Sequence, residues 1–352
     1  MMHMADALIS PAVGGTMMAA TAGLAAYSIK KVQNDLDDQK IPFMGVMGAF
    51  VFASQMINFA IPATGSSGHL GGGMLLAILL GPYAGFLTMA SILLIQALFF
   101  GDGGLLAYGC NVFNLGFCTC FVAYPLIYKW ITRKGLTSRK IFGASMVSAI
   151  LGLQMGAFSV VLETLCSGKT ELPFDTFVLL MQPIHLAIGI VEGLITAAVV
   201  TFVWKARPEI LERAAVGKTL GGISMKKVLA GILAAAIVMG GFVSWFASSN
   251  PDGLEWSLER TAGTAELKAS GGVHDLLANV QSKTAFLPDY NFKTATEDET
   301  NRYAGTSVSG IAGGALTLGL AGLTGWMIRV FKKKAVFWSI VGFSWIMGYA
   351  TN

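Results

Sequence analysis

The sequence predicts an all-α protein that crosses a membrane several times. Of its 352 residues, 54% are hydrophobic and only 12% are charged, and the mean hydropathy is +0.64. Such a composition excludes a water-soluble domain. The formal net charge of +4 reflects basic loops and gives no indication of nucleic-acid binding. We therefore expect the chain to lie in a lipid bilayer and to bind no nucleic acid.

Apolar runs of membrane-spanning length define the expected elements. They fall at 8–29, 41–62, 83–100, 108–128, 141–162, 177–203, 228–248 and 306–328, with a shorter run at 70–81 and an aromatic one at 335–350. The last run fits either a short span or an interfacial helix. Lys and Arg gather at 30–40, 129–140, 205–227 and 329–334, and such clusters mark cytoplasmic loops. The N-terminus is then predicted to be extracytoplasmic, like the loops 63–69 and 101–107.

The first residues of the chain can form a metal chelate that an internal histidine cannot form. The terminal amine, a deprotonated backbone amide and the imidazole of His3 lie in one short stretch. Planar nitrogen donors suit Ni(II) and Cu(II), with Co(II) close behind in imidazole affinity. If Met1 is the first residue, the terminus fills every planar position, whereas a start at Met2 leaves one position open. The alternative interpretation is that His3 is a solvated residue on a frayed terminus.

A second histidine is predicted on the same side of the membrane. His69 is the last residue of the loop 63–69, and three glycines, Gly71, Gly72 and Gly73, follow shortly after it. Small residues let backbones approach closely, as a site around a folded-in terminus would require. A structural role for His69 is the alternative. The pairing of His69 with His3 on one face favours a metal site.

Four stretches of the first 205 residues form a specific pattern in their order, spacing and placement. They are MHMAD (2–6), SSGHLGG (66–72) followed by LGP (80–82), GDGG (101–104) followed by NVFN (111–114), and HLAIGIVEGLIT (185–196). In these stretches the chain resembles the CbiM/NikM family, the nickel- and cobalt-capturing membrane subunits of energy-coupling factor (ECF) transporters.

The resemblance implies a fold and a set of metal ligands. The fold is a seven-helix substrate-capture bundle, and the ligands are nitrogens of Met2, His3 and His69. The chain departs from the family by the additional Met1, which places the family's second-position histidine third. We interpret Met1 as an upstream start, with Met2 as the functional terminus.

Further polar residues are expected near this site. Asn111 and Asn114 lie three apart on one helical face, where they could orient the terminal segment. His185 is an ionisable residue in an apolar span, which makes it a functional candidate near the ligands without being one of them. Asp6 is expected to cap the first helix. Structural roles would also account for these residues.

The C-terminal part has a different character from the first 205 residues. The stretch SNPDGLEWS (249–257) is similar to the small CbiN/NikN auxiliary subunit of the same transporters, and to the module named for its Pro-Asp-Gly-Leu-Glu run. We therefore predict a fusion of two parts, with two further spans and an extracytoplasmic loop in the second. The predicted divisions are a metal-capture domain at 1–205, a cytoplasmic linker at 206–227, an auxiliary segment at 228–330 and a short tail helix at 331–352. The auxiliary segment is expected to assist binding and to supply no ligand.

The predicted function is uptake of Ni2+ or Co2+ across a bacterial cytoplasmic membrane, with no organic cofactor. The chain has no ATPase motif, so the resemblance implies a transmembrane coupling (T) subunit and paired ABC ATPases as partners. One alternative is an intramembrane metalloenzyme using His69, His185 and Glu192, although no HExxH-type spacing supports it. Another is a passive metal channel, including one for copper.

Overall fold

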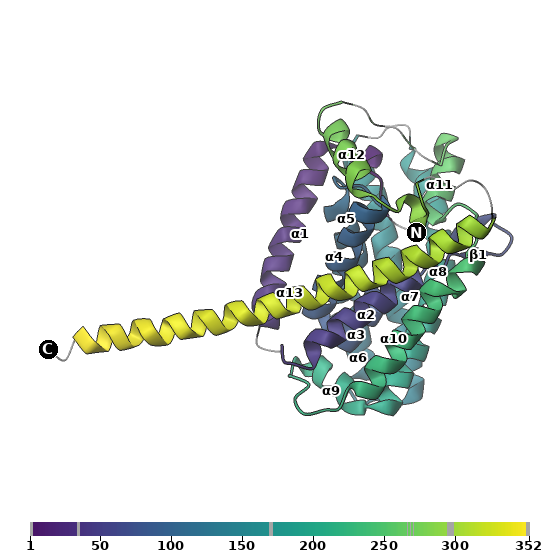
Figure 1. Cartoon of the computed structure of the whole chain (residues 1–352). Coiled ribbons are helices and arrows are strands. Elements are labelled where there is room, and N and C mark those ends of the chain that lie inside the picture. The colour runs from purple at the N-terminus through teal and green to yellow at the C-terminus, as the bar shows by residue number, and fades with distance from the viewer. Residues whose placement is uncertain are drawn as a thin grey trace.

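The computed structural model describes residues 3–33, 36–168, 172–265, 267, 269, 271–293 and 299–349, with side chains for all of these except 299–302 and 333–349. Helices dominate the structure (Figure 1). Up to residue 206 the helical elements are η1 (Asp6–Leu8), α1 (Pro11–Val32), α2 (Lys40–Gln55), α3 (Gly73–Leu80), α4 (Pro82–Ile95), η2 (Gln96–Phe100), α5 (Tyr108–Val112), η3 (Phe113–Tyr128), α6 (Lys129–Thr132), α7 (Ser138–Cys166) and α8 (Phe174–Ala206). The later ones are α9 (Pro208–Val216), α10 (Lys226–Gly241), η4 (Val243–Phe246), α11 (Gly253–Ala262), α12 (Val273–Thr284), η5 (Pro288–Tyr290) and α13 (Glu299–Tyr349).

The predicted all-α membrane fold is confirmed. Six helical stretches in the described part of the chain are long and apolar enough to cross a bilayer. They are 11–32, 82–100, 108–132, 138–166, 174–206 and 303–332. The shorter helices α2 and α3 are almost wholly buried among the others. With these two, the described residues up to 206 form the seven helical segments that the sequence predicts.

The apolar run at 41–62 is not a single helix, contrary to the prediction. α2 ends at Gln55, and the strand β1 (Phe59–Ile61) pairs antiparallel with β2 (Ser66–Gly68). Pro62 has no N–H to continue a helix, and Gly65 has a φ of 74°, so the chain turns back here. Hydropathy alone does not separate a helix from a short strand that follows it in the same apolar run.

The short tail helix expected at 331–352 is not a separate element. α13 continues without interruption from Glu299 to Tyr349, and Figure 1 shows it running well past the bundle. No glycine or proline lies between positions 326 and 341 to end the helix. A change from apolar to basic residues at 329–334 is compatible with one continuous helix.

The C-terminal helices pack on the first part of the chain through α2. Both α10 and α13 contact α2, and they also contact each other. Gly240 of α10 faces Gly310 of α13, where a Cβ on Gly310 would overlap the Gly240 backbone. Small residues permit this close approach of two membrane helices. The shorter helix α11 packs against α8 and β2, and α12 packs against η2.

The basic loops lie together at one end of the bundle. Lys332 donates to the carbonyl of Gln33 (2.9 Å), and the N–H of Gly221 donates to Asp37 (2.6 Å). Figure 1 shows α9 at this end, and α11 and α12 at the opposite end near the N-terminus. The N-terminal residues and the helices α11 and α12 therefore lie at the end of the bundle that is remote from the basic loops.

Candidate metal centre

The N-terminal segment is inserted into the bundle. Met4, Leu8 and Ile9 are at most 1% exposed, which excludes a frayed terminus from residue 4 onward. The N–H of Met4 donates to Asn111 Oδ1 (2.7 Å), and Asn111 Nδ2 donates to the Met4 carbonyl (3.2 Å). The N–H of Gly104 donates to the same carbonyl (2.9 Å). Asn111 and the GDGG loop thus hold the residue directly after His3.

Asp6 caps a different helix from the predicted one. Its Oδ1 accepts from the N–H groups of Leu106 (2.7 Å) and Ala107 (3.0 Å), which directly precede α5. The first helix, α1, is capped by Ser10, whose Oγ accepts from the N–H of Val13. Burial raises the pKa of Asp6, while these backbone hydrogen bonds lower it. The carboxyl therefore fixes the terminal segment to the loop at 101–107, a contact distant in sequence.

His3 has one engaged ring nitrogen and one without a partner. Its Nδ1 donates to Asp102 Oδ1 at 2.7 Å. Its Nε2 is buried and has no hydrogen-bond partner among the described residues. A buried imidazole nitrogen with a free lone pair can bind a metal ion, and the carboxylate on the other nitrogen orients the ring as it lies here.

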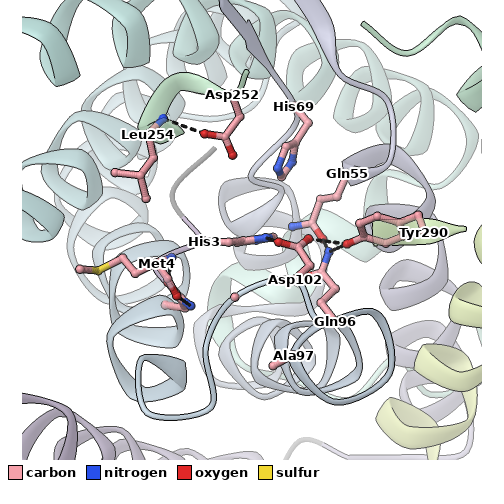
Figure 2. Close-up of polar contacts among 12 residues, drawn as sticks. His3, Met4, Gln55, His69, Gln96, Ala97, Asp102, Asp252, Leu254 and Tyr290 are labelled. Atoms are coloured by element: carbon pink, nitrogen blue, oxygen red, sulfur yellow. Dashed lines mark hydrogen bonds and ion pairs between the residues drawn. The ribbon is translucent and has the colours of Figure 1, made fainter. Parts of the chain in front are cut away.

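His69 lies next to His3 and has a comparable arrangement. The two ring centroids are 5.3 Å apart at an interplanar angle of 62°, and Figure 2 shows His69 pointing toward His3. Its Nδ1 donates to the carbonyl of Leu70 (3.2 Å), which leaves the lone pair on Nε2. Burial holds the pKa of His69 well below its usual range. The imidazole is therefore neutral near pH 7, which is the form that binds metals.

A buried carboxylate shapes the loop that carries His69. The N–H groups of Gly71 and Gly72 donate to Glu192 Oε2 (2.9 Å) and Oε1 (3.1 Å). Gly72 has a φ of 79°, a conformation that residues with a Cβ rarely adopt. Glu192 of α8 therefore fixes the chain just after His69 through two backbone groups and does not face His3.

Besides Asp102, three residues that the sequence did not indicate surround His3: Tyr290, Gln96 and Gln55. Tyr290 donates its phenolic O–H to Asp102 Oδ2, and Gln96 Nε2 donates to the Tyr290 oxygen (3.2 Å) and to Gln55 Oε1 (3.0 Å). Burial alone would raise the pKa of Asp102, but the neighbouring His3 and hydrogen bonds from His3 and Tyr290 hold it below its usual range. Burial raises the pKa of Tyr290 well above its usual value. Of these residues, only Asp102 lies in a stretch that the sequence singled out, GDGG at 101–104.

A cavity of about 370 Å³ adjoins the two histidines. Its lining combines the N-terminal segment with residues of the C-terminal part, including Asp252, Glu255 and Tyr290. The segment after α10 also contacts both loops at this end, because Ser67 N–H donates to the Pro251 carbonyl (2.8 Å), and Gln281 donates to the Gly103 carbonyl (2.8 Å). The auxiliary segment therefore contacts both loops, 63–69 and 101–107.

The remaining predicted residues lie away from the cavity. Asn114 donates to Glu163 Oε2 (2.8 Å) and to the Met4 sulfur (3.7 Å). His185 donates from Nδ1 to the Met181 carbonyl (2.7 Å) and does not line the cavity. Met2, the third predicted ligand, lies outside the described residues.

Among the residues that the structure describes, no cluster of three or more His, Cys, Asp or Glu side chains could hold a metal ion.

Comparisons with known proteins agree with this architecture. The family described as "Cobalt uptake substrate-specific transmembrane region" (CbiM) matches residues 3–210, and the PDGLE domain matches residues 226–330. A putative fused nickel transport protein NikMN of Archaeoglobus fulgidus is 32% identical over 320 residues, which cover 91% of this chain and 96% of that protein. The fused nickel transport protein NikMN of Rhodobacter capsulatus is 30% identical and matches 60% of this chain and 64% of its own length.

A solved structure supports the same assignment. The crystal structure of a truncated transition metal transporter is 32% identical, has a TM-score of 0.52, and covers 58% of this chain and 99% of its own. The names of these relatives indicate metal transport and no enzymatic activity. The chain therefore belongs to the CbiM family of metal-uptake membrane proteins, joined in one polypeptide to a CbiN-like PDGLE segment.

Proposed function

We propose that the chain captures Ni2+ or Co2+ as the substrate-binding component of an ATP-driven ECF-type transporter. The observation that carries the proposal is the pairing of His3 and His69 at 5.3 Å between ring centroids, inside an inserted N-terminal segment. Two imidazoles and main-chain nitrogens form a donor set suited to late first-row ions. The metal ion is the transported substrate.

The proposed ligands are the amine of Met2, nitrogens of His3 and the imidazole of His69. A chelate ring that includes the backbone N of His3 closes through its own Nδ1, which in this structure donates to Asp102. Turning the imidazole about its Cβ–Cγ bond would direct Nδ1 to the metal and let Nε2–H donate to Asp102. Asp102 is then a partner of His3 in both ring orientations.

Nickel is the first ion to test. Low-spin Ni(II) favours four nitrogens in a plane, and the fused relatives carry nickel in their names. Other members of the family are named for cobalt, such as the cobalt transport protein CbiM of Sorangium cellulosum, so Co2+ is the matched comparison. Copper would exceed both in intrinsic affinity, so selectivity would have to come from geometry and ion availability.

The proposed orientation places the metal centre outside the cytoplasmic membrane. The basic loops lie at the end of the bundle opposite to His3, and basic loops favour the cytoplasmic side. Energy would come from a coupling subunit and paired ABC ATPases, because the chain carries no ATPase motif. We propose that residues 1–205 capture the ion, that 206–227 form a cytoplasmic linker, and that the following segment controls access.

Nickel binding and nickel uptake test this proposal separately. Purified protein in detergent should bind Ni2+, and His3→Ala and His69→Ala should each abolish binding while the protein still folds. His274→Ala is the matched control, since the hydrogen bond of His274 goes to the Ile9 carbonyl (3.0 Å). Uptake of radioactive nickel by cells should require the partner ATPases. Equal uptake without them would support a passive channel, and unchanged binding by both histidine variants would refute the site.

A further inference from the structure

We infer that Tyr290, from the C-terminal PDGLE segment, is a positioning residue for His3 and acts through Asp102. The inference rests on the proposed role of His3 as a metal ligand. It assigns to the fused segment one hydroxyl group that is part of the hydrogen-bond network of the metal centre.

The hydrogen bonds have only one consistent direction. Gln96 uses its Nε2 to donate to the Tyr290 oxygen (3.2 Å), so the phenolic hydrogen is free to point at Asp102. Asp102 then accepts from Tyr290 on Oδ2 and from His3 Nδ1 on Oδ1, the latter at 2.7 Å. Figure 2 shows Tyr290, Asp102 and His3 in this order. Each oxygen of the carboxylate is therefore held from a different part of the chain.

Tyr290 is held rigidly enough to act in this way. Its ring stacks on Phe100 with centroids 4.9 Å apart and an interplanar angle of 19°. The N–H of Leu287 donates to the Phe99 carbonyl (3.2 Å), which attaches the preceding turn to η2. Asp289 and Tyr290 have φ values of 49° and 58°, in the left-handed region that residues with a Cβ rarely adopt. Such conformations persist where the surroundings impose them, and they concentrate at functional sites.

The expected consequence is a dependence of metal affinity on a residue of the auxiliary segment. A carboxylate on the second nitrogen of a metal-binding histidine fixes the ring and raises its basicity. Removing such an outer partner typically weakens metal affinity roughly 10–100-fold. Tyr290 contacts His3 only through Asp102, so we expect its removal to weaken metal affinity by about 10-fold, the lower limit of this range.

The test measures Ni2+ affinity of the full-length protein by competition with a chelating dye. Tyr290→Phe keeps the stack on Phe100 and removes only the hydroxyl. Tyr303→Phe is the control, because Tyr303 lies in the same segment with its ring against Trp245. Asp102→Asn interrupts the connection, since an amide has one acceptor oxygen and cannot accept from both His3 and Tyr290.

The inference predicts roughly 10-fold weaker Ni2+ binding for Tyr290→Phe, with wild-type affinity for Tyr303→Phe. The unfolding temperature without metal should fall by no more than the few degrees that loss of one hydrogen bond to a charged group entails. The double variant should bind no more weakly than Asp102→Asn alone, because both changes act through one path. Wild-type affinity in Tyr290→Phe, or effects that simply add, would overturn the inference. If His3→Ala also retained wild-type affinity, the proposed function itself would be wrong. A loss in His3→Ala with none in Tyr290→Phe would refute the inference alone.

Discussion

Replacing Glu192 by Gln should disturb the metal centre without touching a ligand. Glu192 lies in α8, and its two oxygens accept from the N–H groups of Gly71 and Gly72 at 2.9 and 3.1 Å. These glycines follow His69 by two and three residues, and Gly72 needs its positive φ to begin α3. The carboxylate therefore determines where the segment after His69 lies.

The expected magnitude follows from the two hydrogen bonds. A glutamine offers one oxygen and one NH2 group, so one of the two glycine N–H groups would face another donor. Loss of a hydrogen bond to a charged group costs about 1.5–3 kcal/mol. A change of 1 kcal/mol shifts the unfolding temperature by roughly 2–4 °C in chains of 150–250 residues, and by less in this chain of 352 residues, so we expect a decrease of about 3 °C for Glu192→Gln. Displacement of His69 should weaken Ni2+ binding roughly 10-fold, as for other outer partners.

The assay combines thermal unfolding in detergent with Ni2+ titration. The control is Glu212→Gln, since Glu212 is exposed on α9 at the other end of the bundle. Glu212→Gln should change neither property. If Glu192→Gln unfolded and bound Ni2+ like the unmodified protein, the two hydrogen bonds would not fix the His69 segment.

Three further outcomes follow from the contacts at the site and between the helices. His3→Ala and His69→Ala should each lose more Ni2+ affinity than the roughly 10–100-fold typical of an outer partner, as measured by dye competition. His274→Ala should bind within about 3-fold of the unmodified protein, because its carbonyl contact lies outside the imidazole pair, and a complete loss would make it a ligand. Gly310→Ala should lower stability by about 1–3 kcal/mol through overlap with the α10 backbone, whereas Gly319→Ala, with nothing within 4 Å, should not, as thermal unfolding would report.

Much of the fold was predictable because hydropathy and basic loops limit a membrane chain to few arrangements. The spans from α4 to α8 lie close to their predicted ranges. The error at 41–62 arose because a short strand and a helix can share one apolar run, and only Pro62 and Gly65 indicated the change. The continuous α13 was missed because a basic stretch was interpreted as a boundary although nothing there ends a helix.

The candidate site was only partly predictable. The resemblance in 2–6 and 66–72 singled out His3 and His69, and the predicted topology placed them on one side. Asp102 was part of a recognised stretch, but its role depends on an approach of two chain segments 99 residues apart. Tyr290 lies 188 residues beyond Asp102 in a turn with no distinctive pattern, and its backbone conformation cannot be deduced from composition.

Blocking the terminal amine shows directly whether the metal centre includes the N-terminus. Protein that begins at Met2, verified by intact mass, would be compared with the same protein acetylated at its amine, and Ni2+ affinity measured for both. If the amine is a ligand, acetylation should lower Ni2+ affinity by more than the roughly 10–100-fold that loss of an outer partner causes, and folding should be unchanged. Equal Ni2+ affinity of the free and acetylated proteins would contradict a metal centre built on the N-terminus.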